Sequence, residues 1–64
     1  MTLTELKRIC SEKAERYPEL KDNIEALVDF CEENIERGCP ANKEVFTCYE
    51  FVIDIIKNHE KWEA

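Results

Sequence analysis

Hydrophobic residues recur at steps of three and four in the first quarter of the chain, the spacing that gathers them on one side of an α-helix. Thr2 and Glu5 fit a capping box, in which the hydroxyl accepts a hydrogen bond from a backbone N–H and the carboxylate reaches back to the cap. Pro18 disfavours helical geometry at Tyr17 and cannot donate to the preceding turn. The pattern therefore predicts an amphipathic helix over about residues 3–16.

The second segment carries the clearest helical pattern in the chain. Proline suits the first position of a helix and acids are favourable in its first turn, so Pro18 and Glu19 indicate a helix start. Gly38, which follows Arg37, is suited to a C-terminal cap. The apolar stripe between these ends consists of Leu20, Ile24, Leu27, Val28, Cys31 and Ile35. We predict a helix over about residues 19–37.

β-branched and aromatic residues crowd the third segment, so residue propensity alone favours a strand there. Its polar positions fall at alternating steps of four and three, however, which is a helical period. We therefore predict a third helix over about residues 43–61, with a short strand within residues 39–49 as the alternative. The predicted fold is mainly α, with three short amphipathic helices in a single domain over residues 1–64, or else two helices plus one short strand.

Apolar side chains surround most of the third helix, more than the first two helices can cover. On a helical projection Phe51 and Ile55 lie on one flank, and Phe46 and Ile53 on the other. Burial of each would contribute about 1.5–3 kcal/mol, a large share of a small domain's stability. We therefore predict an intertwined homodimer with a C2-symmetric seam that also includes Phe30. The alternatives are a monomeric three-helix bundle and a subunit that buries this surface against another protein.

The charge balance disfavours direct contact with nucleic acid or with an anionic membrane. Fifteen Asp and Glu against nine Lys and Arg give a net charge of −6 over 64 residues. The N-terminus lacks the apolar stretch of a secretory signal, and no segment approaches the apolar length of a membrane span. We expect a single small domain located in the cytoplasm.

The cysteines are interpreted as reduced thiols. In the absence of an export signal, Cys10, Cys31, Cys39 and Cys48 are expected to serve as small hydrophobic residues rather than as disulfides. Structural zinc usually draws its ligands from closely spaced pairs, and no such pair occurs here. We predict no metal site and no cofactor.

No motif indicates an enzyme. The chain has one glycine, too few for a glycine-rich phosphate loop, and no nucleophile motif. His59 falls in the last turn of the third predicted helix, where the helix dipole favours a histidine without any catalytic role. We therefore predict no catalytic residues.

Acidic side chains recur at helical spacing along the second predicted helix. Carboxylates in such a row can imitate a line of phosphates and occupy the groove of a nucleic-acid-binding protein. The acidic face consists of Glu25, Asp29, Glu32, Glu33 and Glu36. A solvated helix face is the simpler interpretation, because Lys21 and Arg37 dilute the field of these carboxylates.

In size, acidity and reduced-cysteine usage, and in its helical stretches 20–36 and 46–62, the chain resembles the small orphan early-region accessory proteins of temperate lambdoid bacteriophages. The likeness spans the whole chain and rests on no motif, so it assigns no site residue. It implies a small dimeric helical fold in the host cytoplasm. It also implies a non-enzymatic factor, made early in infection, that promotes lytic development or modulates a host protein.

The predicted function is therefore a protein–protein interaction factor. Hydrophobic surface around Phe30, Phe46, Phe51 and Ile55 would form the dimer seam and a cleft for an amphipathic helix of a host or phage protein. The alternative function is an acidic nucleic-acid mimic that blocks a nucleic-acid-binding protein.

Overall fold

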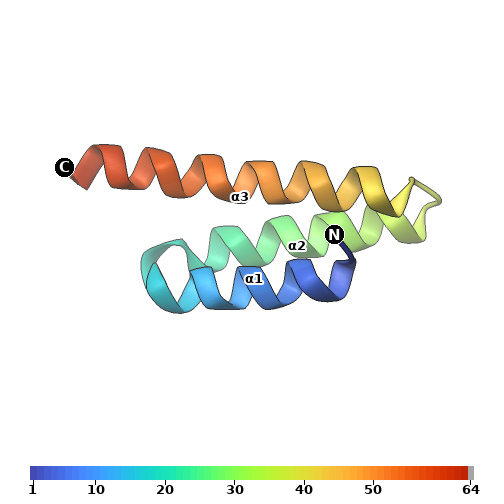
Figure 1. Cartoon of the computed structure of the whole chain (residues 1–64), viewed down its shortest axis with the longest axis horizontal. Helices are drawn as coiled ribbons and strands as arrows, with labels where there is room; N and C mark the ends of the chain where they lie inside the picture. Colours follow the sequence, from blue (N-terminus) through green and yellow to red (C-terminus); the bar gives the residue numbers. More distant parts are fainter. Residues whose placement is uncertain (64) are drawn as a thin grey trace.

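A computed structural model of the chain describes residues 1–63, and the side chains of residues 1–62. The elements are α1 (Leu3–Arg16), the 3₁₀ turn η1 (Pro18–Leu20), α2 (Lys21–Glu36) and α3 (Ala41–Glu63). Figure 1 shows the three α-helices running alternately in opposite directions, in an elongated bundle of 40 × 18 × 17 Å. Ala64, the last residue of the predicted domain, lies outside the described residues.

The mainly α fold is confirmed, and the alternative of two helices plus a strand is wrong. Residues 41–49 form the start of α3, and no strand occurs within residues 1–63. The structure follows the helical period of the polar positions rather than the β propensity of individual residues. A helix that packs against two neighbours can use β-branched side chains on its buried face, so weak local preference is overridden by packing.

The start of α1 has the predicted cap, with one difference in detail. The backbone N–H of Glu5 donates to Oγ1 of Thr2 at 3.2 Å. The Glu5 carboxylate bonds the Thr2 hydroxyl, at 3.4 Å, rather than the backbone N–H of the cap. The helix ends before Pro18, where Tyr17 has non-helical backbone angles and its N–H donates to the carbonyl of Lys13.

The second helix starts later than predicted. Pro18 opens a 3₁₀ turn in which the N–H of Leu20 donates to the carbonyl of Tyr17, and α geometry begins at Lys21. At the other end Gly38 takes a positive φ of 105°, a conformation that glycine adopts at little cost. The N–H groups of Gly38 and Cys39 donate to carbonyls of the last turn, which is the Schellman arrangement.

The third helix begins at Ala41, two residues before the predicted start. The carbonyl of Pro40 accepts the N–H of Glu44 at 3.0 Å, so Pro40 is the residue that caps the first turn. Proline fixes φ near the helical value and has no N–H that needs a partner, so it is compatible with a helix that begins at the next residue.

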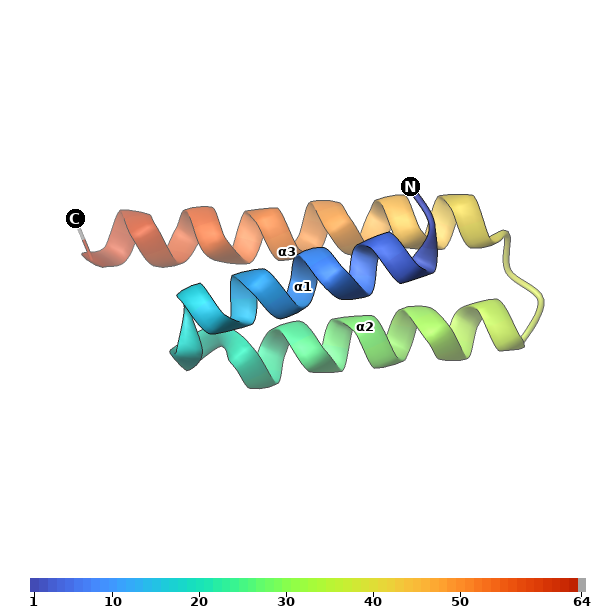
Figure 2. The same cartoon turned by 60° about the horizontal axis from the view of Figure 1, so that its bottom comes forward.

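The core lies along the common axis of the three helices, with α1 resting over the gap between α2 and α3 (Figure 2). It consists of aliphatic and cysteine side chains and contains no aromatic ring among the described residues. Its buried members are Leu6, Cys10, Leu20, Ile24, Cys31, Val45, Cys48, Val52 and Ile56. The aromatic residues are therefore left for the surface or for partly buried positions.

Candidate functional site

The exposed aromatic side chains are the first unusual feature of the surface. Phe30 and Phe46 are each 60% exposed, Phe51 is 54% exposed and Trp62 is 88% exposed. These are all three phenylalanines and the one tryptophan of the chain. Phenylalanine is among the residues that proteins bury most often, so a core without phenylalanine and a surface with all three is unusual.

The predicted seam residues divide into two surfaces on opposite flanks of α3. Phe46 and Phe51 are five positions apart and therefore point about 140° apart around the helix. Phe46 and Ile53 differ by only about 20°, and Phe51 and Ile55 by about 40°. Ile53 and Ile55 are half-buried, and Ile55 packs against the core. A single flat contact cannot cover all of these side chains.

One surface lies between α2 and α3. Phe30 of α2 and Phe51 of α3 line a pocket of about 150 Å³, which we call the Phe30–Phe51 groove. The remaining lining residues are mostly apolar and comprise Leu27, Cys31, Glu44, Thr47 and Cys48. The Glu44 carboxylate is held by Asn34, whose Nδ2 donates to Oε2 at 3.0 Å. The groove is thus an apolar hollow whose one acidic lining residue, Glu44, is hydrogen-bonded to Asn34.

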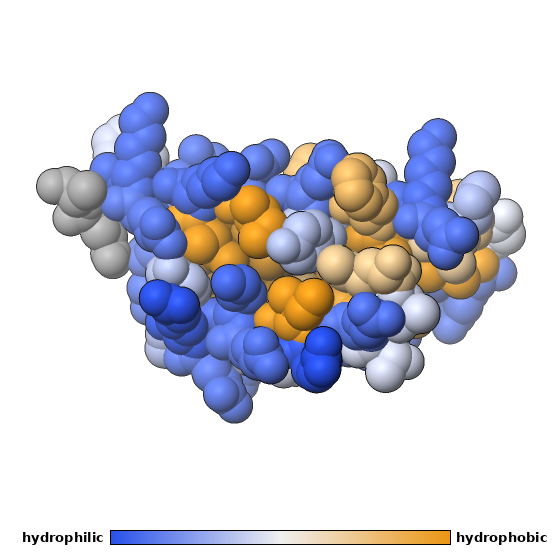
Figure 3. Space-filling view, viewed as in Figure 1, coloured by the Kyte–Doolittle hydropathy of each residue, from blue (hydrophilic) through white to orange (hydrophobic). Residues whose placement is uncertain are grey.

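The other surface lies on the side of α3 that faces α1. Glu60 shares this side of the helix with Phe46 and Ile53, and the hydroxyl of Tyr17, at the end of α1, donates to its carboxylate. Figure 3, in the orientation of Figure 1, shows hydrophobic surface gathered between α3 and α1. Each flank of α3 therefore carries its own apolar patch.

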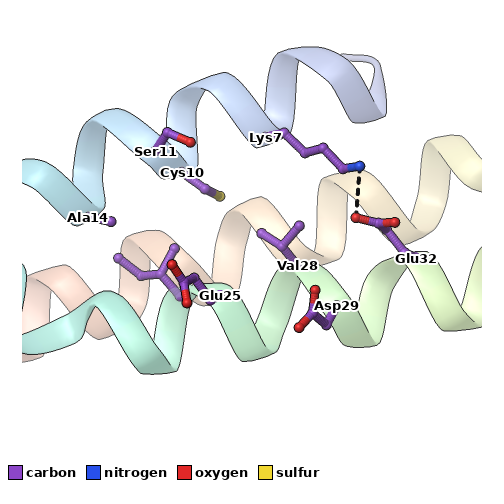
Figure 4. A pocket seen from close by; sticks show the side chains of 9 residues that line it. Lys7, Cys10, Ser11, Ala14, Glu25, Val28, Asp29 and Glu32 are labelled. Carbon is purple, nitrogen blue, oxygen red and sulfur yellow. Dashed lines mark ion pairs between the residues drawn. The ribbon is translucent and has the colours of Figure 1, made fainter.

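The predicted acidic face lies on α2, with four of its carboxylates exposed and Glu32 half-buried. Glu25, Asp29 and Glu32 line a hollow of about 310 Å³ between α1 and α2. Figure 4 shows Lys7 reaching across it from α1, and its Nζ lies 2.9 Å from Oε1 of Glu32. Glu33 and Glu36 are exposed outside this hollow.

The cysteines of the three helices meet in the core and are all free thiols. Cys10, Cys31 and Cys48 are buried, whereas Cys39 is exposed in the loop between α2 and α3. Burial raises the pKa of Cys10 and of Cys31, and raises that of Cys48 to about 12; neighbouring thiols add to the effect at Cys10 and Cys48, and the Glu44 carboxylate adds to it at Cys31. Thiols that stay protonated are poor nucleophiles. No group of His, Cys, Asp or Glu among the described residues is arranged to hold a metal ion.

A polar cluster that no sequence pattern indicated joins α3 to the turn between α1 and α2. His59 Nε2 lies 2.6 Å from Oε1 of Glu19, and the ring of Tyr17 meets that of His59 edge-on with centroids 5.9 Å apart. The backbone N–H of Glu19, and then His59, lower the pKa of the Glu19 carboxyl. The partners are about forty positions apart along the chain, which is why spacing alone gave no signal for them.

Among the described residues, no helix combines the length and the apolar composition needed to cross a membrane. Comparison of the chain with protein-family models, with curated proteins and with solved structures finds no match.

Proposed function

We propose that this protein is a non-enzymatic interaction factor that works as a homodimer, and that the Phe30–Phe51 groove forms the dimer seam. The observation that carries the proposal is the exposure of every phenylalanine of the chain around a core of aliphatic and cysteine side chains. Large aromatic side chains at the centre of an interface contribute most of its binding free energy. The intertwining predicted from the sequence stays a prediction.

The charge distribution favours the Phe30–Phe51 groove as the contact between two copies. Each chain carries a net charge of −6, so two copies repel unless they meet where charge is sparse. The exposed residues one and two helical turns from Phe30 and Phe51 include four without charge, which are Asn23, Ala26, Thr47 and Asn58. Three exposed charges lie at the same steps, with Glu33 and Asp54 one turn from Phe30 and Phe51 and Arg37 two turns from Phe30, so the proposed seam places them at its polar rim.

The size of a stable interface sets how far the seam extends. A standard interface buries about 800 Å² on each partner, whereas the whole chain exposes 4768 Å². Roughly a sixth of the surface is therefore needed, more than the exposed parts of Phe30 and Phe51 alone provide. The proposed seam therefore runs further along α2 and α3 and takes in the half-buried Leu27 and Ile55.

The proposal is tested by sedimentation velocity on the wild type and on two matched variants. Phe51→Glu places a charge in the groove and should give monomers, or unfolded chains if the dimer is obligatory. Phe46→Glu makes the same change on the opposite flank of α3 and should leave the dimer intact. A folded wild type that stays monomeric at millimolar concentration, or a dimer disrupted only by Phe46→Glu, would overturn the proposal. Circular dichroism on each sample separates dissociation from unfolding.

An accessory role in early phage development is proposed from the sequence resemblance alone. The expected result is that expression of the chain in a bacterial host shifts infection by a temperate phage towards lysis, measured as the fraction of surviving lysogens. A Phe51→Glu chain should not produce the shift if the dimer is the active form.

The acidic face supports the second candidate function, a nucleic-acid mimic. Glu25, Asp29, Glu33 and Glu36 are exposed on one side of α2. A basic partner held by these charges should lose affinity steeply between about 50 and 200 mM salt. Binding through an apolar groove should change little over that range.

A further inference from the structure

Two adjoining hollows make one continuous groove between α1 and α2, which we call the α1–α2 groove. They share Ser11, Ala14 and Glu25 as lining residues. The groove lies away from Phe30 and Phe51, neither of which lines it. Whatever occupies it is therefore independent of the proposed dimer seam.

The floor of the α1–α2 groove is apolar. Cys10 and Ile24 are buried beneath it, and Ala14 and Val28 are half-buried at its surface. On the α1 side the lining residues Ser11 and Ala14 are small, so no long side chain from these positions closes the hollow (Figure 4). The floor therefore offers room for aliphatic side chains from outside.

The rim on the α2 side carries three carboxylates, Glu25, Asp29 and Glu32, and one cation, Lys21, at its end nearest the turn. Glu25 and Asp29 are exposed and make no ion pair with the described side chains of residues 1–62. Glu32, one turn further along, is paired with Lys7 of α1 at 2.9 Å. That internal contact shows that a lysine carried by a helix lying beside α2 reaches the carboxylate row.

We propose that the α1–α2 groove docks one amphipathic helix of a partner protein, with aliphatic side chains against Val28 and Ala14 and with Lys or Arg against Glu25 and Asp29. Helix-in-groove docking uses an apolar face for affinity, and the flanking charges select the partner. A second copy of this chain is a poor occupant, because its own net charge of −6 would meet the acidic rim. Glu25, Asp29 and Glu32 follow one another at steps of four and three, a spacing that basic residues on a helix lying alongside α2 can match.

This arrangement differs from a pure phosphate mimic in what the partner must contribute. A mimic needs only the charges of α2, whereas helix docking also needs the apolar floor. The two are separated by changes that fill the floor and leave every charge in place.

The test uses a labelled synthetic peptide of about five helical turns, built from leucine at steps of three and four with lysine elsewhere. Its binding is followed by fluorescence anisotropy, next to matched peptides in which glutamine or glutamate replaces lysine. We expect the lysine peptide to bind, the glutamine peptide to bind about tenfold more weakly and the glutamate peptide not to bind. Equal binding of the lysine and glutamine peptides would overturn the role of the rim.

Two double variants with matched losses of charge locate the binding. Glu25→Gln with Asp29→Asn should weaken the lysine peptide about tenfold, while Glu12→Gln with Glu50→Gln, the same loss of charge at exposed positions outside the groove, should not. Equal effects of the two pairs would mean unspecific attraction and overturn the proposal.

Ser11→Phe fills the groove without changing charge and should weaken binding of the lysine peptide to a similar extent. Circular dichroism checks that the variant is folded. Full affinity in Ser11→Phe would leave only the electrostatic mimic and would also overturn helix docking. Phe51→Glu should keep the peptide affinity if the chain stays folded, so failure of the dimer and failure of this groove are distinguishable.

Discussion

His59 and Glu19 join the C-terminal part of α3 to the turn that precedes α2, with Nε2 of His59 2.6 Å from Oε1 of Glu19. Tyr17 adds a second link, because its hydroxyl donates to Glu60 in the next position of α3. Figure 1 shows α3 continuing past this turn to the C-terminal end of the chain. The two links hold the part of α3 where the other helices offer the least packing surface.

Replacement of Glu19 should change how stability depends on pH. The pKa of the Glu19 carboxyl is lowered in the folded state, first by its own backbone N–H and then by His59. A carboxyl with a lowered folded pKa contributes stability above its unfolded pKa, and this contribution is lost as the pH falls through the folded pKa. Glu19→Gln should therefore lower stability at neutral pH and reduce the loss seen on acidification.

Urea unfolding at pH 7 and at about pH 3 measures this difference. Glu12→Gln is the control, since Glu12 is an exposed carboxyl of α1 outside the cluster. Wild type and Glu19→Gln with the same pH dependence would show that neither the backbone contact nor the His59 contact of this carboxylate contributes to stability in solution.

Thiol reactivity should distinguish one cysteine from the other three. Cys39 is exposed, whereas Cys10, Cys31 and Cys48 are buried with raised pKa values, about 12 for Cys48. Because only the thiolate reacts, a disulfide reagent at mildly alkaline pH should label Cys39 rapidly and the others only after denaturant is added. Cys39→Ser should remove the rapid phase. Rapid labelling of that variant would show that the core opens in the native state.

The helices could be predicted because their signals are local. The period of polar residues, the Thr2–Glu5 cap and the position of Gly38 each depend on residues within a few positions of one another. Boundaries differ where proline acts: Pro18 produces a 3₁₀ turn before α2, and Pro40 starts α3 early.

The candidate sites could be predicted only in part. Periodicity identified the residues on each flank of α3, but not which flank meets α1 and which meets α2. That depends on how the helices turn back on one another, as do the contacts of Glu19 with His59 and of Lys7 with Glu32. The α1–α2 groove was missed for the same reason, since its small residues come from α1 and the acids Glu25, Asp29 and Glu32 from α2.

Any side chain at position 38 should lower the stability of the fold, because of the backbone conformation of Gly38 alone. Its φ of 105° is one that L-residues rarely adopt, and a Cβ added there would meet no atom within 4 Å. Gly38→Ala should therefore cost about 1–2 kcal/mol from strain, without any clash. Gly38→Asn should cost less, because asparagine tolerates positive φ better. Chemical denaturation measures the stability of both variants. A Gly38→Ala variant as stable as the wild type would show that the helix end can relax.

Loss of a buried thiol should lower stability through lost volume. Cys31 is 2% exposed and packs where α2 meets α3. Cys31→Ala should cost on the order of 1–2 kcal/mol, and Cys39→Ala, at an exposed position, should cost almost nothing. The comparison requires only urea unfolding of the two variants. Equal stability of both variants would mean that the Cys31 side chain is not packed in the core as described.

The concentration dependence of thermal unfolding gives a thermodynamic test of the dimer that does not depend on hydrodynamic size. If two chains associate through the Phe30–Phe51 groove, folding and association are linked, so the Tm should rise with protein concentration. Phe51→Ser removes an aromatic side chain from the centre of the seam without adding a charge. Its Tm should be lower than that of the wild type and should rise less with concentration, whereas Phe46→Ser should keep the wild-type dependence. A wild-type Tm that is constant over a hundredfold range of concentration would mean that one chain is stable with its phenylalanines in water, and that the groove is left for a different protein.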